Sequence, residues 1–226
     1  MKVQIIAQTK PTNKLTITEY LACIARKCYT TYNYKHIIDI ELNKSMKPKS
    51  IIEHIIKAGH TSILEHYSIT FSIEGVSVAL LGQLTRHRLS SFTVQSLRYN
   101  NLSFDDKINV VIPEELKKNI NDINDIYYKS ISDSFNKYIE LIEKGYKPQT
   151  ARYVLPQGIE TNLIMTMNLR ELFHFLDLRN CNRADEEIHK LATNIYDICK
   201  EQDKFLFSFA KHSCEQCNNK CGKFKK

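Results

Sequence analysis

A long stretch of helical periodicity, from Asp122 to Lys144, is the feature that most constrains the fold. Apolar side chains recur there three and four residues apart, which places them on one face of a helix, and Gly145 ends the pattern. The apolar positions are Ile123, Ile126, Tyr127, Ile131, Phe135, Tyr138 and Ile142. A helix of this length favours a fold in which helices predominate.

Shorter segments predict the remaining elements. Strict alternation predicts a strand over His66–Ile73 that turns Tyr67, Ile69, Phe71 and Ile73 toward the core. Further strands are expected over 2–8 and 162–167, and helices over 16–28, 50–59, 76–88, 148–156, 169–178 and 184–211. The helix at 50–59 would open with the capping box Ser50-x-x-Glu53. Helices with a few strands, not in regular alternation, indicate the α+β class.

Composition bounds the organisation of the chain. With 226 residues, no internal repeat and no linker, we expect one domain over residues 1–211 and a Cys- and Lys-rich tail over 212–226. No apolar run is long enough to cross a membrane, and the N-terminus does not resemble a signal peptide. Four of the seven cysteines, namely Cys23, Cys28, Cys181 and Cys199, are scattered through the chain, which favours free thiols and a cytoplasmic location.

The tail carries Cys214-x-x-Cys217-x-x-x-Cys221, preceded by His212. These side chains are of the type that binds zinc. The pattern lacks a second paired half, so a tail with spare thiols is the preferred interpretation and no metal site is predicted.

The distribution of arginine is a stronger signal than the net charge of +7. The chain has 24 lysines but only eight arginines, and seven of the eight fall in two windows. Those seven are Arg86, Arg88, Arg98, Arg152, Arg170, Arg179 and Arg183. The guanidinium fork suits phosphate or a heteroaromatic edge, whereas structural ion pairs are the alternative use. With only six glycines, the chain has neither G-x-G-x-x-G nor a Walker A loop, so a nucleotide would not bind on a Rossmann turn.

One arginine segment has the spacing of a phosphate site. Arg86-His87-Arg88 is followed, after seven intervening residues, by Ser96-Leu97-Arg98. Fixed cations, a hydroxyl and backbone N–H groups are a suitable set for a phosphate. Without the second half, Arg86-His87-Arg88 would be interpreted as a basic helix end that complements its own dipole.

This segment resembles the signature of the flavin-dependent thymidylate synthases, and further segments extend the resemblance in the same order. They are Gly59–His66, Ala151–Pro156, Asn168–Leu172 and Leu178–Ala184. The resemblance implies a flavin-dependent thymidylate synthase-like fold, helix-rich with a small, mostly antiparallel sheet. It also implies a cytoplasmic homotetramer with active sites between subunits, and no nucleic-acid or membrane partner.

The resemblance assigns roles residue by residue. FAD would contact Ser62, Arg86, His87, Arg88, Asn168, Arg170 and His174. The substrate dUMP would contact Gln83, Arg86, Gln95, Ser96, Leu97, Arg98, Arg152 and Arg179, with Arg152 coming from a neighbouring subunit. Arg179 would sit on the uracil ring and favour its N3-ionised form, and His60 would support catalysis beside the flavin.

The implied reaction is the reductive methylation of dUMP to dTMP, with 5,10-methylenetetrahydrofolate as carbon donor, NADPH as reductant and no enzyme nucleophile. Val94 departs from the family, which often has Glu there, and Asp185-Glu186-Glu187 replaces its usual Gln-Trp-Glu. Two alternatives stay open: a module that binds nucleic-acid phosphates, and a degenerate family member kept for assembly. The separation of the arginines along the chain disfavours the first.

Overall fold

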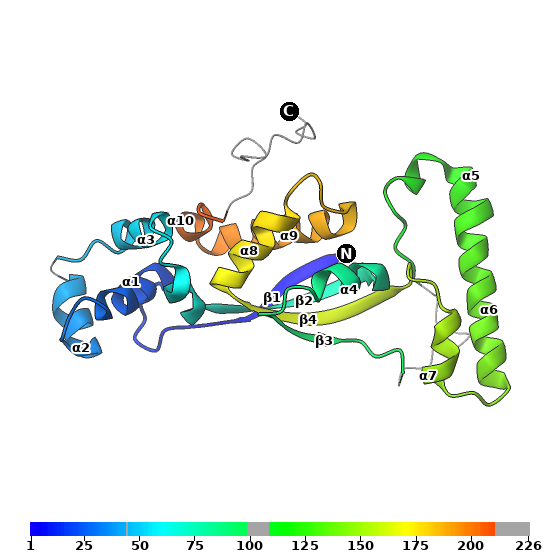
Figure 1. Cartoon of the computed structure of the whole chain (residues 1–226), viewed down its shortest axis with the longest axis horizontal. Helices are drawn as coiled ribbons and strands as arrows, with labels where there is room; N and C mark the ends of the chain where they lie inside the picture. Colours follow the sequence, from blue (N-terminus) through cyan, green and yellow to red (C-terminus); the bar gives the residue numbers. More distant parts are fainter. Residues whose placement is uncertain (44, 99–108, 211–226) are drawn as a thin grey trace.

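The computed structural model describes residues 1–43, 45–98 and 109–210. Its centre is an antiparallel sheet with the strand order β1-β2-β4-β3 (Figure 1). The strands are β1 Lys2–Gln8, β2 Ser68–Ser77, β3 Ser91–Val94 and β4 Glu160–Asn168. Helices predominate around this small sheet, so the predicted α+β character is confirmed.

The helices vary from single turns to long rods. The α-helices are α1 Ile17–Lys27, α2 Tyr34–His36, α3 Pro48–Lys57, α4 Val78–Leu84, α5 Ile120–Asp122, α6 Lys129–Glu143, α7 Pro148–Ala151, α8 Leu169–Arg179, α9 Glu186–Gln202 and α10 Lys204–Phe207. Segments of 3-10 helix are η2 Thr61–His66, η3 Leu116–Lys118 and η5 Arg152–Val154, and segments of π-helix are η1 Ile37–Leu42 and η4 Ile123–Tyr128.

The main core lies against one face of the sheet and is built with buried residues of the helices α1, α3, α4, α8, α9 and α10 (Figure 1). Strand β2 contributes Ile69, Phe71 and Ile73, all fully buried, while the residues between them are half-exposed. Tyr67, just before the strand, is buried as well. The alternation predicted for this segment is therefore confirmed, because side chains of successive strand residues point to opposite faces.

The helix predicted over 76–88 is wrong at both ends. Strand β2 continues to Ser77, whose hydroxyl then caps α4 by accepting a hydrogen bond from Leu80 N. The helix ends at Leu84, and His87 N donates to Leu84 O in the turn that follows. Arg86 and Arg88 therefore lie beyond the helix and are exposed, on either side of the buried His87.

Two other predicted helix boundaries also need correction. Pro48 occupies the first turn of α3, so this helix starts before Ser50 and the predicted capping box does not form. The long helix predicted over 184–211 breaks at Asp203, which has an extended backbone and caps α10 by accepting from Leu206 N. Its other oxygen accepts from Thr18 of α1, so a tertiary contact holds the break.

The segments α5, η4 and α6 form a helical arm that stands away from the sheet (Figure 1). A separate small core joins α6 to α7, and it consists of Phe135, Tyr138, Ile139 and Ala151. Ile126 lies on the predicted apolar face but is 63% exposed. The prediction is wrong for Ile126 because the small core beside α7 begins only at Phe135, whereas Ile123 on the same predicted face is buried.

The Cys/His motif in the predicted tail lies outside the described residues. Among residues 1–43, 45–98 and 109–210, no helix is long and apolar enough to cross a membrane. In the same ranges, His, Cys, Asp and Glu side chains form no group of three that is placed to hold a metal ion.

Candidate functional site

A cavity of about 560 Å³ opens between the turn after α4 and helix α8, from the first turn of that helix to its last residue. Its volume is in the range of small-molecule sites. Six predicted site residues line it, namely Arg86, His87, Arg88, Arg170, His174 and Arg179. Leu89, Glu171 and Leu178 complete the lining. The sequence thus predicted most of the cavity wall from segments more than 80 residues apart.

Helix α8 presents its polar side chains to this cavity for a local reason. Asn168 caps the helix by accepting from Glu171 N over 2.9 Å. Glu171, Phe175 and Arg179 follow at intervals of four residues and therefore share one helix face. Phe175 is fully buried on that face and holds it against the core, so the Glu171 carboxylate and the Arg179 guanidinium are fixed on either side of it.

His87 lies between Glu171 and Arg179. Its Nδ1 is 2.9 Å from Glu171 Oε1, and its Nε2 accepts from Arg179 Nε over 3.1 Å. His87 is buried, and its ring makes an edge contact with Phe175. Burial lowers the pKa of His87 below its ordinary value of 6.5, and the positive charge of Arg179 acts in the same direction, although the hydrogen bond to Glu171 opposes both. A neutral imidazole at neutral pH follows.

The cavity is electrostatically positive. Within the described ranges, no carboxylate lies within 4.0 Å of Arg86 or Arg88, whereas Arg170 pairs with Glu65 over 2.5 Å. Burial and the neighbouring charge of Arg86 lower the pKa of Arg179. Two guanidinium groups held close together without an acid between them favour an anionic or electron-rich ligand.

The remaining predicted arginines form a second set at the other end of β3. Arg98 Nη2 donates to Gln149 Oε1 of α7 over 3.3 Å, and Ser96 Oγ accepts from Arg98 N. Arg152 follows α7 directly, with its guanidinium 5.9 Å from the ring centroid of Tyr153. We call Gln95–Arg98 with Arg152 the distal set. None of its members lines the cavity.

Strand β3 separates the two sets within one chain. Arg88 precedes Ser91–Val94 and Gln95 follows it. A strand of four residues is about 13 Å long, so the arginines on its two sides point to different regions of the protomer. Val94, the departure from the family pattern, packs against the main core from within this strand.

Four predicted residues lie near the cavity without lining it. Asn168 Oδ1 is used in capping α8. His60 and Ser62 belong to the start of η2, which packs against α8 and is tied to it by the pair Glu65–Arg170. The Gln83 backbone carbonyl accepts from Arg179 Nη2 over 3.2 Å, but the side chain lines a different cavity.

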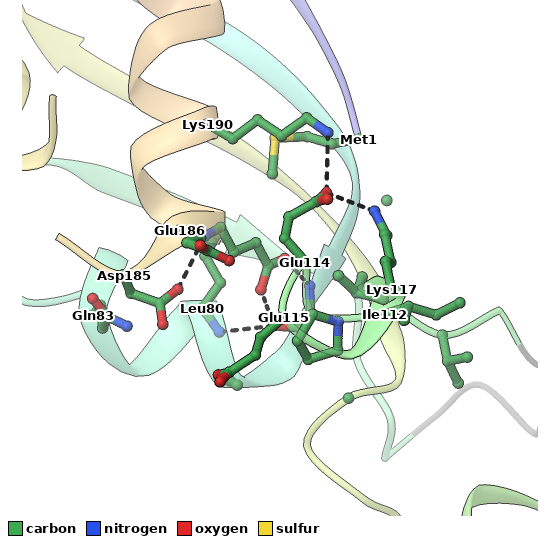
Figure 2. Close-up of a pocket in the computed structure, with 18 of the residues that line it drawn as sticks. Met1, Leu80, Gln83, Ile112, Glu114, Glu115, Lys117, Asp185, Glu186 and Lys190 are labelled. Atoms are coloured by element: carbon green, nitrogen blue, oxygen red, sulfur yellow. Dashed lines mark hydrogen bonds and ion pairs between the residues drawn. The ribbon is translucent and has the colours of Figure 1, made fainter. Parts of the chain in front are cut away.

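That second cavity, of about 860 Å³, lies between α4, the start of α9 and the segment 110–117 (Figure 2). Its charged lining is mainly acidic, with Glu114, Glu115, Glu160, Asp185, Glu186 and Glu187 against Lys117, Arg183 and Lys190. Both lysines point to Glu114 (Figure 2). Although this cavity is larger, its carboxylates repel phosphate, so the smaller cationic cavity is the better anion site.

Asp185–Glu187, which stands where the family usually has Gln-Trp-Glu, has a structural role beside this second cavity. Asp185 caps α9 by accepting from Glu187 N, and the Glu187 carboxylate accepts from the backbone and hydroxyl of Ser77. These contacts join α9 to the start of α4, which explains how this chain packs without the usual residues.

Comparison with known proteins agrees with the geometry. Residues 12–203 match the family described as thymidylate synthase complementing protein. The chain belongs to this family. A flavin-dependent thymidylate synthase of Sulfolobus acidocaldarius is 34% identical over 95% of this chain and 78% of its own length. Proteins of the same description from Pyrococcus furiosus and Geobacter sulfurreducens are 38% and 35% identical, over 77% and 86% of this chain and 69% and 82% of their own lengths.

For this member of the thymidylate synthase complementing family, sequence reasoning missed Leu89, Glu171 and Leu178 in the cavity and Gln149 beside Arg98. Glu171 had a detectable signal, because it lies four residues before Phe175 and eight before Arg179 and so shares their helical face. Gln149 had none, since its contact with Arg98 joins residues 51 positions apart.

Proposed function

We propose that the chain is a flavin-dependent thymidylate synthase that converts dUMP to dTMP. It takes the carbon from 5,10-methylenetetrahydrofolate and the reducing equivalents from NADPH by way of FAD. The observation that carries this proposal is the convergence of Arg86, Arg88, Arg170 and Arg179 on one cavity, in a chain whose relatives carry that description.

The cavity residues fit FAD. Arg86 and Arg88 offer uncompensated positive charge for a pyrophosphate, and Arg170 adds a third guanidinium. Leu89 and Leu178 are 71% and 46% exposed and give apolar surface for a flat ring system. His174 lines the cavity, and the capping role of Asn168 leaves its amide N–H groups free to donate. When bound, FAD supplies the hydride chemistry that these side chains cannot perform.

Arg179 is the catalytic residue of the proposal. Its guanidinium lies at the cavity wall, where it would face the uracil ring and stabilise negative charge on N3. A preorganised charge of this kind is typically worth about 3 kcal/mol of transition-state stabilisation. Gln83 and Arg86 would hold the same nucleotide. His60 and Ser62, next to α8, would support the flavin side of the site.

We further propose a homotetramer in which the distal set of one subunit completes the cavity of its neighbour. Gln95, Ser96, Leu97, Arg98 and Arg152 would then hold the phosphate and sugar of dUMP. The separation of the two sets by β3 supports this arrangement, as do exposed apolar side chains on and beside the arm. These are Ile120, Ile126, Tyr128, Tyr146 and Tyr153. The cytoplasmic location stays a prediction.

Two measurements on the purified chain test the proposed activity. The protein should carry the visible absorption of an oxidised flavin, and it should oxidise NADPH faster once dUMP is added. Adding methylenetetrahydrofolate should then give dTMP, identified by chromatography and mass spectrometry. A colourless protein that retards nucleic acid on a gel would support the binding module instead. Flavin without turnover that depends on dUMP would support the degenerate member.

A further inference from the structure

Glu171 is a buried acid to which neither the resemblance nor the proposed function gives a role. Its side chain is 6% exposed, and its partner His87 is 3% exposed. A buried carboxylate is costly unless it is hydrogen-bonded, so the contact between Glu171 Oε1 and His87 Nδ1 is needed by the acid as well as by the ring. Because both groups are fixed, the contact constrains where the imidazole carries its proton.

The hydrogen bond on the other side of the ring determines the tautomer. A guanidinium group has N–H donors and no acceptor. Since Arg179 Nε donates to His87 Nε2, Nε2 must be the unprotonated nitrogen. The single proton of a neutral ring then lies on Nδ1 and is donated to Glu171. The other tautomer, or a protonated ring, would set two N–H groups against each other at Nε2.

The same contacts fix the direction of Arg179. Glu171 and Arg179 lie about 12 Å apart along α8, and the imidazole occupies the space between their side chains. Nε is held by His87 and Nη2 by the Gln83 carbonyl, which leaves three of the five N–H groups for the cavity. A free arginine at the last position of a helix would instead lose rotamer entropy on binding its ligand.

The geometry points to Glu171 as a positioning residue: through the proton on His87 Nδ1, its carboxylate sets the tautomer that aims the Arg179 guanidinium into the cavity. This inference rests on the proposed function for the identity of the ligand, which is the uracil ring of dUMP. The charged or titratable groups that face His87 are Glu171, His174 and Arg179 of α8, with Arg86 beside Arg179.

The test compares the holoenzyme with its Glu171→Gln variant. Glutamine has the same size, but its amide can also donate to Nδ1 and so favour the wrong tautomer. Solid-state nitrogen NMR with isotope-labelled histidine reads the tautomer, and the His87 signal is assigned by its loss in His87→Gln. We expect the Nδ1–H form in the wild type and a shift toward the Nε2–H form in Glu171→Gln. The kcat should fall by on the order of ten- to a hundredfold at unchanged flavin content.

Two further variants separate positioning from stability. Asp203→Asn makes the same chemical change at a structural carboxylate outside the cavity, so it should lower the Tm but leave the tautomer and kcat unchanged. Glu171→Asp keeps the charge and should recover the wild-type tautomer and part of the kcat. It also provides the measurement if Glu171→Gln does not fold.

An unchanged tautomer and kcat in Glu171→Gln would overturn the positioning role. The NMR measurement needs no turnover, which keeps it independent of the proposed activity. A wild-type enzyme without turnover that depends on dUMP would refute the proposed function, whereas the tautomer in the variants would still decide whether Glu171 controls His87.

Discussion

Arg179 Nε donates to His87 Nε2 over 3.1 Å, although the two residues are 92 positions apart in the sequence. This contact joins the signature segment after α4 to the last residue of α8. It makes Arg179 a preorganised cation, because the group is oriented before any ligand arrives. The cavity that it faces also contains Arg86, Arg88 and Arg170, the arginines expected to bind FAD.

Substitution of Arg179 should separate cofactor binding from catalysis. We expect Arg179→Ala to retain flavin, because Arg86, Arg88 and Arg170 remain in the cavity. Turnover that depends on dUMP should fall about a hundredfold or more, since a preorganised charge is lost. Arg26→Ala, on α1 and outside both arginine windows, serves as the control. Equal steady-state rates for the two variants would contradict the role of Arg179.

The pKa of His87 should make the stability depend on pH in one direction. Its value in the folded chain lies below the ordinary 6.5. As the pH falls below about 6.5, the unfolded chain gains a proton that the folded chain does not, so the free energy of unfolding decreases. One such proton contributes at most about 1.4 kcal/mol per pH unit. Its contribution is fully present above the unfolded pKa and is lost as the pH falls toward the folded pKa.

Urea unfolding at about pH 7.5 and about pH 5.5 measures this effect. The His87→Gln variant should lose less stability between the two values than the wild type. The same substitution at the exposed His54 is the control and should leave the dependence unchanged. If the free energy of unfolding of His87→Gln fell with pH as steeply as that of the wild type, His87 would titrate normally in the folded chain.

The attachment of the arm gives a prediction about packing. A Cβ at Gly158 would overlap the hydroxyl of Tyr127, which donates to Val111 O over 2.7 Å. Gly158→Ala should therefore destabilise the chain by about 1–3 kcal/mol, as overpacking does. In a Tyr127→Phe background the same change should cost less, because the overlapping oxygen is gone. Chemical unfolding of all four proteins gives the coupling, and simple additivity would contradict the predicted overlap.

Thiol reactivity should differ between two free cysteines. Cys28 is exposed, whereas burial raises the pKa of Cys199 to about 12. Because the thiolate is the reactive form, iodoacetamide should modify Cys28 in the native protein and Cys199 only after unfolding. Peptide mass spectrometry distinguishes the two sites. Similar labelling of both in the native protein would mean that Cys199 is accessible.

The elements predicted with success are those that local periodicity determines. Strand β2 and helix α8 follow from alternation and helical spacing, and Pro148 and Gly145 mark real boundaries. The errors lie where a distant contact decides the outcome. Asp203 breaks the last long helix with the help of Thr18, which is 185 residues away.

The site shows the same division. Arg86-His87-Arg88 and the later segments of the resemblance named six of the nine residues that line the cavity. They did not predict that His87 is a buried link between Glu171 and Arg179, because burial and hydrogen-bond partners depend on how α8 lies against the turn after α4. Of the distal set, they placed only Arg152 in a neighbouring subunit; the separation of Gln95–Arg98 from the cavity follows from the course of β3.

Subunit complementation tests the central claim, that two arginine sets from different subunits form one site, most directly. Arg98→Ala and Arg179→Ala should each be inactive alone. Mixed oligomers, formed by co-expression with two different tags and purified through both, contain some sites in which each set is intact. Random pairing predicts about a quarter of the wild-type activity. Mixed oligomers that bind flavin but stay as inactive as the single variants would show that the two sets do not meet between subunits.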